Sequence, residues 1–148
     1  MKVRVSTLIR LLPVFAMVLY VACSGSRREE SEAAVSCYSY TTPEDSIMLR
    51  LNWQGDAVEG ELTYYLHEKD ANRGKIVGTM RNDTLYADYT FQSEGVTSIR
   101  EVAFIRRGDV LVEAFGEVEE RDGKFVFIDR SLLTPNENVM LRLVDCNP

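Results

Sequence analysis

The sequence is poor in the residues that build metal centres. Its 148 residues include one histidine and three cysteines. These numbers exclude most dense metal sites, which usually need four such ligands. Basic residues are also few: 17 lysines and arginines stand against 23 acidic residues, which gives a net charge of −6. A chain without a basic excess is poorly suited to neutralising phosphates, so we expect no nucleic-acid partner. The length suggests one domain.

The apolar run at residues 11–22 is too short to cross a bilayer as a helix, which needs about 20 residues. Lys2, Arg4 and Arg10 precede the run, and the small residue Ala22 ends it. A basic start, a short apolar middle and a small residue at the end are typical of a secretory signal peptide. The sequence therefore predicts a signal peptide over residues 1–22.

Residues 21–26, Val-Ala-Cys-Ser-Gly-Ser, resemble the lipobox of bacterial lipoproteins. Ala22 supplies the small residue before the cysteine, while Tyr20 stands where the family usually has leucine. The resemblance implies removal of the preceding peptide and lipidation of Cys23. Several acyl chains on one residue give stable attachment to a membrane.

Without its signal peptide the chain loses three of its 17 basic residues, which leaves 14 against 23 acidic ones and a net charge of −9. Residues 23–36 comprise the lipidated cysteine and a tether of small and charged residues. In some lineages an acidic run directly after the cysteine directs lipoproteins to the cell surface, but here Arg27 and Arg28 precede Glu29 and Glu30. We expect a lipid-anchored envelope protein at the outer membrane that faces the periplasm, with surface exposure left open.

The two remaining cysteines, Cys37 and Cys146, bracket the predicted domain at residues 37–148. A pair of cysteines in an exported chain normally forms a disulfide. Two free thiols or a redox pair are the alternative, although the sequence has no Cys-x-x-Cys motif. A disulfide would bring the first and last strands close together, as in a closed sheet.

The domain is predicted to be all-β, because short strand-like runs alternate with turn signals and no segment has a sustained helical period. Residues 131–137 have at most one turn of helix. We expect a single antiparallel barrel of about eight strands, with a β-sandwich as the alternative. The predicted strands are residues 37–41, 47–53, 58–67, 75–81, 84–92, 98–107, 110–118, 124–128 and 139–146.

Alternation of apolar and polar residues assigns the interior face of three predicted strands. In the third and fifth strands this face begins at Val58 and Leu85, and in the seventh it includes Val112 and Ala114 opposite Glu113. Small interior residues favour a closed barrel, which is either filled by side chains or holds one small ligand. The large side chains expected to fill it are Trp53, Phe91, Phe125 and Phe127.

The layout of a lipobox before a disulfide-bracketed β domain is similar to small bacterial envelope lipoproteins. The barrel resembles lipocalin-like and lysozyme-inhibitor barrels in outline. The lipocalin Gly-x-Trp motif is absent, since Leu51 and Asn52 precede Trp53. Residues 93–98 are the nearest equivalent of the inhibitors' Ser-Gly loop and match it poorly. The resemblance therefore carries no functional residue over to this chain.

The densest polar group beside an aromatic strand suggests a binding site. Arg100 alternates with apolar residues of its strand, which would direct its side chain inward. A buried arginine needs a carboxylate partner or a bound anion, and Glu94 is the expected partner. A structural ion pair and a ligand contact both remain open. The candidate binding residues are Ser93, Glu94, Ser98 and Arg100, beside Glu101.

Three weaker patterns each have a structural alternative. Residues 45–47 and 83–85 fit an Asp-Ser/Thr-apolar pattern that would place O-glycans on Ser46 and Thr84, but aspartates in turns before strands explain both equally well. His67 lies near acidic residues, and we interpret it as a surface histidine. Residues 70–74 place oxygen atoms at alternate positions, as calcium loops do, but lack the distal glutamate, so we expect a hairpin turn and no metal site.

Together these features predict a non-enzymatic binding module for a protein partner in the cell envelope. No nucleophile motif or acid–base pair is recognisable, and we expect no cofactor. The alternative is a lipocalin-like carrier of a small apolar ligand, with a cavity lined by residues such as Tyr64, Tyr89 and Phe91. The sequence does not name the partner or the ligand.

Overall fold

The computed structural model describes residues 34–69 and 71–147. The predicted signal peptide, the lipidation site Cys23 and residues 23–33 of the predicted tether lie outside the described residues. Ten strands and one short 3-10 helix, η1 (Arg130–Leu132), make up the described chain. The strands are β1 (Ala34–Thr41), β2 (Ser46–Gln54), β3 (Ala57–Tyr65), β4 (Asn72–Arg81), β5 (Thr84–Ser93), β6 (Val96–Arg107), β7 (Val110–Phe115), β8 (Val118–Arg121), β9 (Lys124–Phe127) and β10 (Thr134–Val144).

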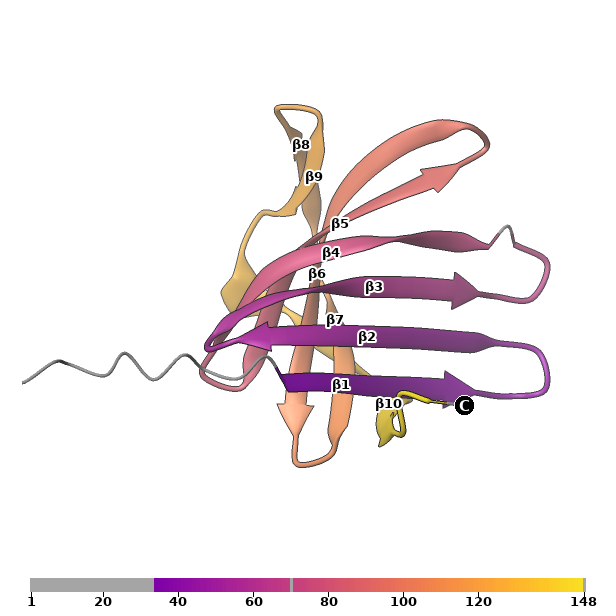
Figure 1. The fold of residues 1–148 in the computed structure, drawn as a ribbon. Helices are drawn as coiled ribbons and strands as arrows, with labels where there is room; N and C mark the ends of the chain where they lie inside the picture. Colours follow the sequence, from indigo (N-terminus) through magenta and orange to yellow (C-terminus); the bar gives the residue numbers. More distant parts are fainter. Residues whose placement is uncertain (1–33, 70, 148) are drawn as a thin grey trace, which may run out of the picture.

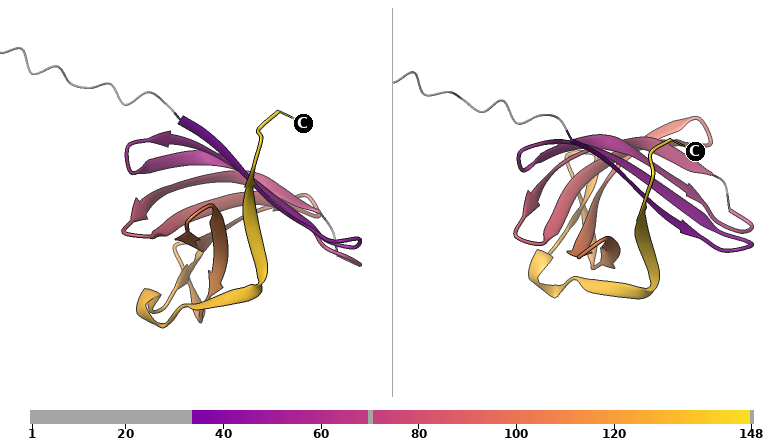
Figure 2. Two further views of the ribbon diagram at one scale, coloured as in Figure 1. Left: turned by 90° about the horizontal axis from the view of Figure 1, so that it is seen from below. Right: turned by 60° about the horizontal axis from the view of Figure 1, so that its bottom comes forward.

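Eight of the strands close into an antiparallel barrel, as the sequence predicted. Strands β1 to β7 pair with their neighbours in order, β7 pairs with β10, and β10 returns to β1. The views in Figure 2 show the sheet curling round, with yellow β10 closing it beside indigo β1. The remaining two strands form the β8–β9 hairpin, which projects from the barrel beside β6 (Figure 1).

The interior faces of β3 and β5 follow the predicted alternation. Val58 and Leu62 of β3, and Leu85 and Tyr89 of β5, are all buried in the main core. Gly60 lies on the same face of β3 as Val58, and a Cβ atom there would lie 1.9 Å from the carbonyl oxygen of Arg50. The backbones of β2 and β3 therefore approach each other more closely than any other residue would allow.

The predicted face of β7 is wrong. Leu111 packs in the main core and Glu113 lies on the same face, whereas Ala114 packs in a second cluster with Ala103 and Phe127. This cluster lies on the outer side of the barrel wall. Because β9 covers that wall, both faces of β7 are buried, and alternation cannot distinguish the inside from the outside.

Two of the aromatic residues expected to fill the barrel lie outside it. Trp53 and Phe91 pack against the main core, but Phe127 belongs to the outer cluster and Phe125 is exposed. The reason is that β9 lies beside β6 as an extra strand and does not enter the barrel wall. The main core is filled by aliphatic and tyrosine side chains and by Phe104, which come from all around the barrel.

Several strand boundaries differ from the prediction. Strand β1 begins at Ala34 and not at residue 37, and β7 ends at Phe115, after which the chain turns into the separate strand β8. The helical turn expected within residues 131–137 is present as η1, with Asp129 accepting a hydrogen bond from the Ser131 amide at 2.8 Å. Within the described residues, no helix has the length and apolar character needed to span a membrane.

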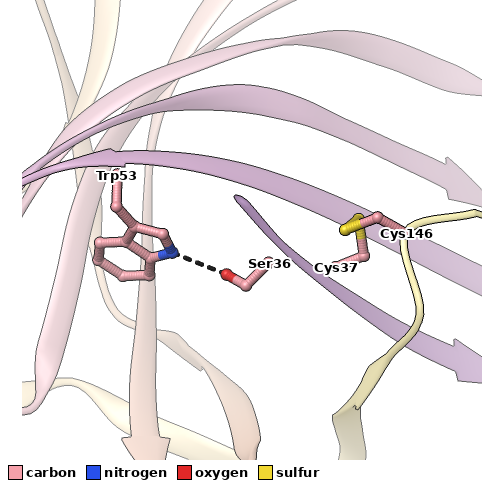
Figure 3. Close-up of a disulfide and its surroundings, with 4 residues drawn as sticks. All are labelled: Ser36, Cys37, Trp53 and Cys146. Carbon is pink, nitrogen blue, oxygen red and sulfur yellow. Dashed lines mark hydrogen bonds between the residues drawn. A yellow bond between two sulfur atoms is a disulfide. The ribbon is translucent and has the colours of Figure 1, made fainter. Parts of the chain in front are cut away.

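The predicted disulfide joins the two ends of the barrel. Cys37 of β1 and Cys146, just after β10, are bonded, with their Cα atoms 5.2 Å apart (Figure 3). Near this bond, Trp53 Nε1 donates a hydrogen bond to Ser36 Oγ at 2.7 Å. Only three residue pairs, from Cys37↔Val144 to Ser39↔Arg142, join β1 to β10. The disulfide thus lies beside the shortest antiparallel seam of the barrel wall.

Candidate functional site

A cavity of about 350 Å³ opens where β6 and β7 diverge. Strand β6 begins at Val96, but β7 pairs with it only from Ala103 onward. The preceding part of β6 is paired with β5 on one side and meets β9 on the other only at Arg100↔Phe125. The gap in the ladder leaves room for the pocket. Its lining residues are Phe91, Ser98, Arg100, Glu101, Val102, Glu113, Ala114, Phe115, Gly116, Val118, Phe125 and Phe127.

Arg100 is the positive group of this pocket, and aromatic rings surround it. Its guanidinium carbon lies 5.3 Å from the ring centroid of Tyr64, and 5.5 Å from those of Tyr89 and Phe91. All three rings are within the range of a cation–π interaction. The Tyr89 and Phe91 rings are stacked with centroids 4.8 Å apart, so they present one continuous aromatic wall to the arginine. The sequence prediction that Arg100 points inward is in agreement with this placement.

The guanidinium of Arg100 lacks a carboxylate partner in the described part of the chain, where no acidic oxygen lies within 4.0 Å of its nitrogens. Its Nε atom is buried and has no hydrogen-bond partner among the described residues. Buried polar groups are nearly always satisfied, and those that are not call for an explanation such as a ligand.

Glu113 is the negative group of the pocket, and it is bonded to a tyrosine. It is 4% exposed, and Tyr64 donates a hydrogen bond from its hydroxyl to Glu113 Oε1 at 2.7 Å. Burial raises the pKa of Glu113, and this effect outweighs the opposing effects of the Tyr64 hydrogen bond and the charge of Arg100. The neutral form of the acid is therefore favoured more than it is in water.

The two tyrosines whose rings lie beside Arg100 belong to the main core, do not line the pocket, and remain protonated. Burial raises the pKa of Tyr64 well above its usual value, and burial raises that of Tyr89 to about 12. The Tyr89 hydroxyl donates to the backbone carbonyl of Asn72 at 2.9 Å. Both hydroxyls are therefore used as donors within the barrel, and neither is poised as a nucleophile or base.

A second carboxylate fixes the outer side of the pocket. Glu101, on the outer face of β6, is 6% exposed and accepts a hydrogen bond from the Phe127 amide at 2.9 Å. Arg130 forms an ion pair with the same carboxylate and lies 4.6 Å from the ring centroid of Tyr86. These contacts hold β9 and η1 against the barrel wall and position the aromatic residues of β9 at the pocket entrance.

Apolar side chains form the rim of the pocket. Phe115 at the end of β7, Val118 of β8 and Phe125 of β9 are each close to half exposed. The pocket thus combines exposed apolar side chains with one guanidinium and two buried carboxylates. Most ligand sites have this composition, with many apolar groups and few polar ones.

The structure brings together only two of the four predicted binding residues. Ser98 and Arg100 line the pocket, but Ser93 is the last residue of β5 and Glu94 lies in the turn that follows. The predicted pairing of Glu94 with Arg100 is wrong. Glu94 is exposed with a φ of 50°, and the carboxylate near Arg100 is Glu113 from the neighbouring strand β7.

The other predicted sites are not part of this pocket. Ser46 and Thr84 begin β2 and β5, are half-buried, and stay predictions as glycosylation sites. Their preceding aspartates have structural contacts: Asp45 Oδ1 accepts from the His67 amide at 2.8 Å, and Asp83 forms an ion pair with Arg106. The His67 side chain is exposed.

The described residues contain no group of three or more histidine, cysteine, aspartate or glutamate side chains that could hold a metal ion. Comparison with protein-family models, curated proteins and solved structures finds no significant match.

Proposed function

We propose that this chain is a lipid-anchored binding protein of the cell envelope without enzymatic activity, and that the pocket between β6 and β7 binds a small, largely apolar ligand. The pocket carries the proposal: its volume of about 350 Å³ falls in the range of small-molecule sites. The lipobox around Cys23 supports the anchor, and the disulfide is consistent with an oxidising compartment.

The arrangement of the pocket favours binding over catalysis. The pocket lining has two buried acids, Glu101 and Glu113. Glu113 accepts a hydrogen bond from the Tyr64 hydroxyl, Glu101 forms an ion pair with Arg130, and the lining contains no cysteine or histidine. Charged groups in a site with many aromatic contacts orient a ligand. We therefore favour the carrier of a small ligand, with a module for a protein partner as the second candidate. The exposed rim residues Phe115, Val118 and Phe125 support the second candidate.

A neutral fluorescent probe tests ligand binding. N-phenyl-1-naphthylamine becomes brighter in an apolar site, so the purified protein should enhance its emission saturably. Ser98→Trp fills the pocket from β6 and should abolish this enhancement. The matched control Thr79→Trp, at an exposed position of β4, should retain it. Equal enhancement by both variants, or none by the unmodified protein, contradicts the proposed site.

The anchor is tested at Cys23. Cells that express the protein and are labelled with radioactive palmitate should yield a labelled chain, and Cys23→Ser should remove the label and release the protein from the membrane fraction. Globomycin treatment should retain the precursor. Membrane retention of Cys23→Ser by the same route contradicts lipidation.

A further inference from the structure

The guanidinium of Arg100 lines the pocket without a carboxylate partner in the described part of the chain, and it points to the chemistry of the ligand. We propose that the pocket selects an amphipathic carboxylate, whose headgroup pairs with Arg100 while its apolar part lies between the rim residues. This inference rests on the proposed function, since it names the class of ligand for the same site.

Arg100 has no carboxylate partner among the described residues. Its Nε atom is buried with no acceptor in the described part of the chain, although guanidinium groups in the interior are normally paired. Three aromatic rings lie 5.3–5.5 Å from its central carbon. Rings interact with the charge but accept no strong N–H hydrogen bond. The terminal nitrogens of the guanidinium, unlike the enclosed Nε, therefore remain available to a ligand.

The carboxylate of Glu113 does not take the place of the ligand. Glu113 accepts a hydrogen bond from Tyr64 at 2.7 Å and lies outside ion-pair distance of Arg100. It also belongs to β7, on the other side of the gap from β6. An added carboxylate can therefore approach Arg100 from the pocket without displacing Glu113.

The charges of the pocket favour a carboxylate over a cationic ligand. An ammonium group would meet the charge of Arg100, and both lining carboxylates already have partners. Glu113 accepts from Tyr64, and Glu101 accepts from the Phe127 amide and pairs with Arg130. Guanidinium matches the planar carboxylate with two parallel hydrogen bonds. The remaining lining, from Phe115, Val118 and Phe125, suits a hydrocarbon chain.

Equilibrium dialysis with radiolabelled decanoate and 1-decanol tests the proposal, because the two probes share the same chain length and differ in headgroup charge. The purified full chain should bind decanoate at least about tenfold more tightly than decanol, since a charge-assisted hydrogen bond contributes well over a factor of ten. Arg100→Met should lower decanoate affinity by about the same factor and leave decanol affinity unchanged. Arg100→Lys should retain part of the preference.

The matched control is Arg106→Met, which makes the same substitution on the same strand at an exposed position that pairs with Asp83. It should change neither affinity, and circular dichroism should show a folded barrel for every variant. Equal binding of both probes, with no effect of Arg100→Met, overturns the headgroup inference and leaves the proposed pocket intact. Failure of both probes to bind overturns the proposed function as well.

Discussion

Removing the disulfide should weaken the closure of the barrel more than any other change to its seam. Cys37 and Cys146 are separated by 109 residues, so the bond closes nearly the whole described chain into one loop. It also lies beside the β1–β10 seam, which has only three paired residues on each strand. The double variant Cys37→Ala/Cys146→Ala removes the bond without leaving a free thiol.

The magnitude follows from the length of the loop. A cross-link that closes a loop of about 100 residues removes chain entropy from the unfolded state worth about 4.7 kcal/mol at 25 °C. Engineered and native bonds often deliver less, and removal of a native disulfide from a small exported domain typically costs about 2–5 kcal/mol. We expect a loss of unfolding free energy in that range, which is a large part of the stability of an ordinary domain.

Urea unfolding followed by tryptophan fluorescence measures this loss. Trp53 is the only tryptophan and donates to Ser36 of β1, so its emission reports on the strand that carries Cys37. The double variant should unfold at a much lower urea concentration, and the unmodified protein with added reductant should behave in the same way. A difference below about 1 kcal/mol, or no effect of the reductant, would refute the reasoning because the loop-closure contribution would then be absent.

Three further predictions concern buried polar groups and close packing. Burial raises the pKa of Glu113, so its contribution to stability is present below its ordinary pKa of 4.5 and is lost as the pH rises through the pKa of the folded state. Glu113→Gln keeps an acceptor for Tyr64 and should unfold less readily than the unmodified protein at pH 7.5. A difference in stability that does not shrink toward pH 4.5 contradicts the assignment. Glu101→Ala leaves the Phe127 amide without its acceptor and should cost about 1–3 kcal/mol in urea unfolding, with faster hydrogen exchange at that amide; unchanged exchange would argue against the contact. Gly60→Ala forces β2 and β3 apart and should cost about 1–3 kcal/mol; full stability in thermal unfolding would mean that the close approach is absent.

The barrel could be predicted from the sequence because the patterns that indicate a barrel lie within short stretches of the chain. In β3 and β5 one face is buried and the other is more exposed to solvent, so apolar and polar residues alternate. The turns between strands contain residue types that are typical of turns. The two cysteines then indicated which strands meet at the seam. Each of these signals can be read within a few residues or from a single pair.

The pocket could be predicted only in part, because its charges come from different strands. The alternation of β6 directed Arg100 inward, but the carboxylate whose charge it affects is Glu113 of β7. Glu113 pairs with Phe104, further along β6, so no local pattern around Arg100 indicates that the two side chains face the same pocket. The sequence predicted Glu113 on the outer face of β7. This prediction is wrong because β9 buries that outer face, so its residues are apolar and resemble those of an interior face. One clue was available: a glutamate between Val112 and Ala114 in an otherwise apolar run is consistent with either face.

The β8–β9 hairpin is the second feature in which the structure differs from the sequence prediction. Strand β8 has four exposed residues, of which three are charged, so neither burial nor alternation marks it as a strand. Its pairing with β9 is fixed by the turn at Asp122 and Gly123, both of which have positive φ. The hairpin supplies Val118 and Phe125, two of the three rim residues of the pocket. The strand at residues 124–128 was predicted, but β8 was not recognised as a separate strand, so the hairpin was not predicted.

The central claim is that the gap between β6 and β7 is a ligand site, and amide chemical-shift mapping with decanoate tests it most directly. The account predicts that the largest shifts fall on Ser98 to Val102, on Phe115 and Gly116, and on Phe125 to Phe127, and that Arg100→Met removes them. Shifts confined to the opposite turns, such as that after Gln54, or no saturable shifts at all, would contradict it.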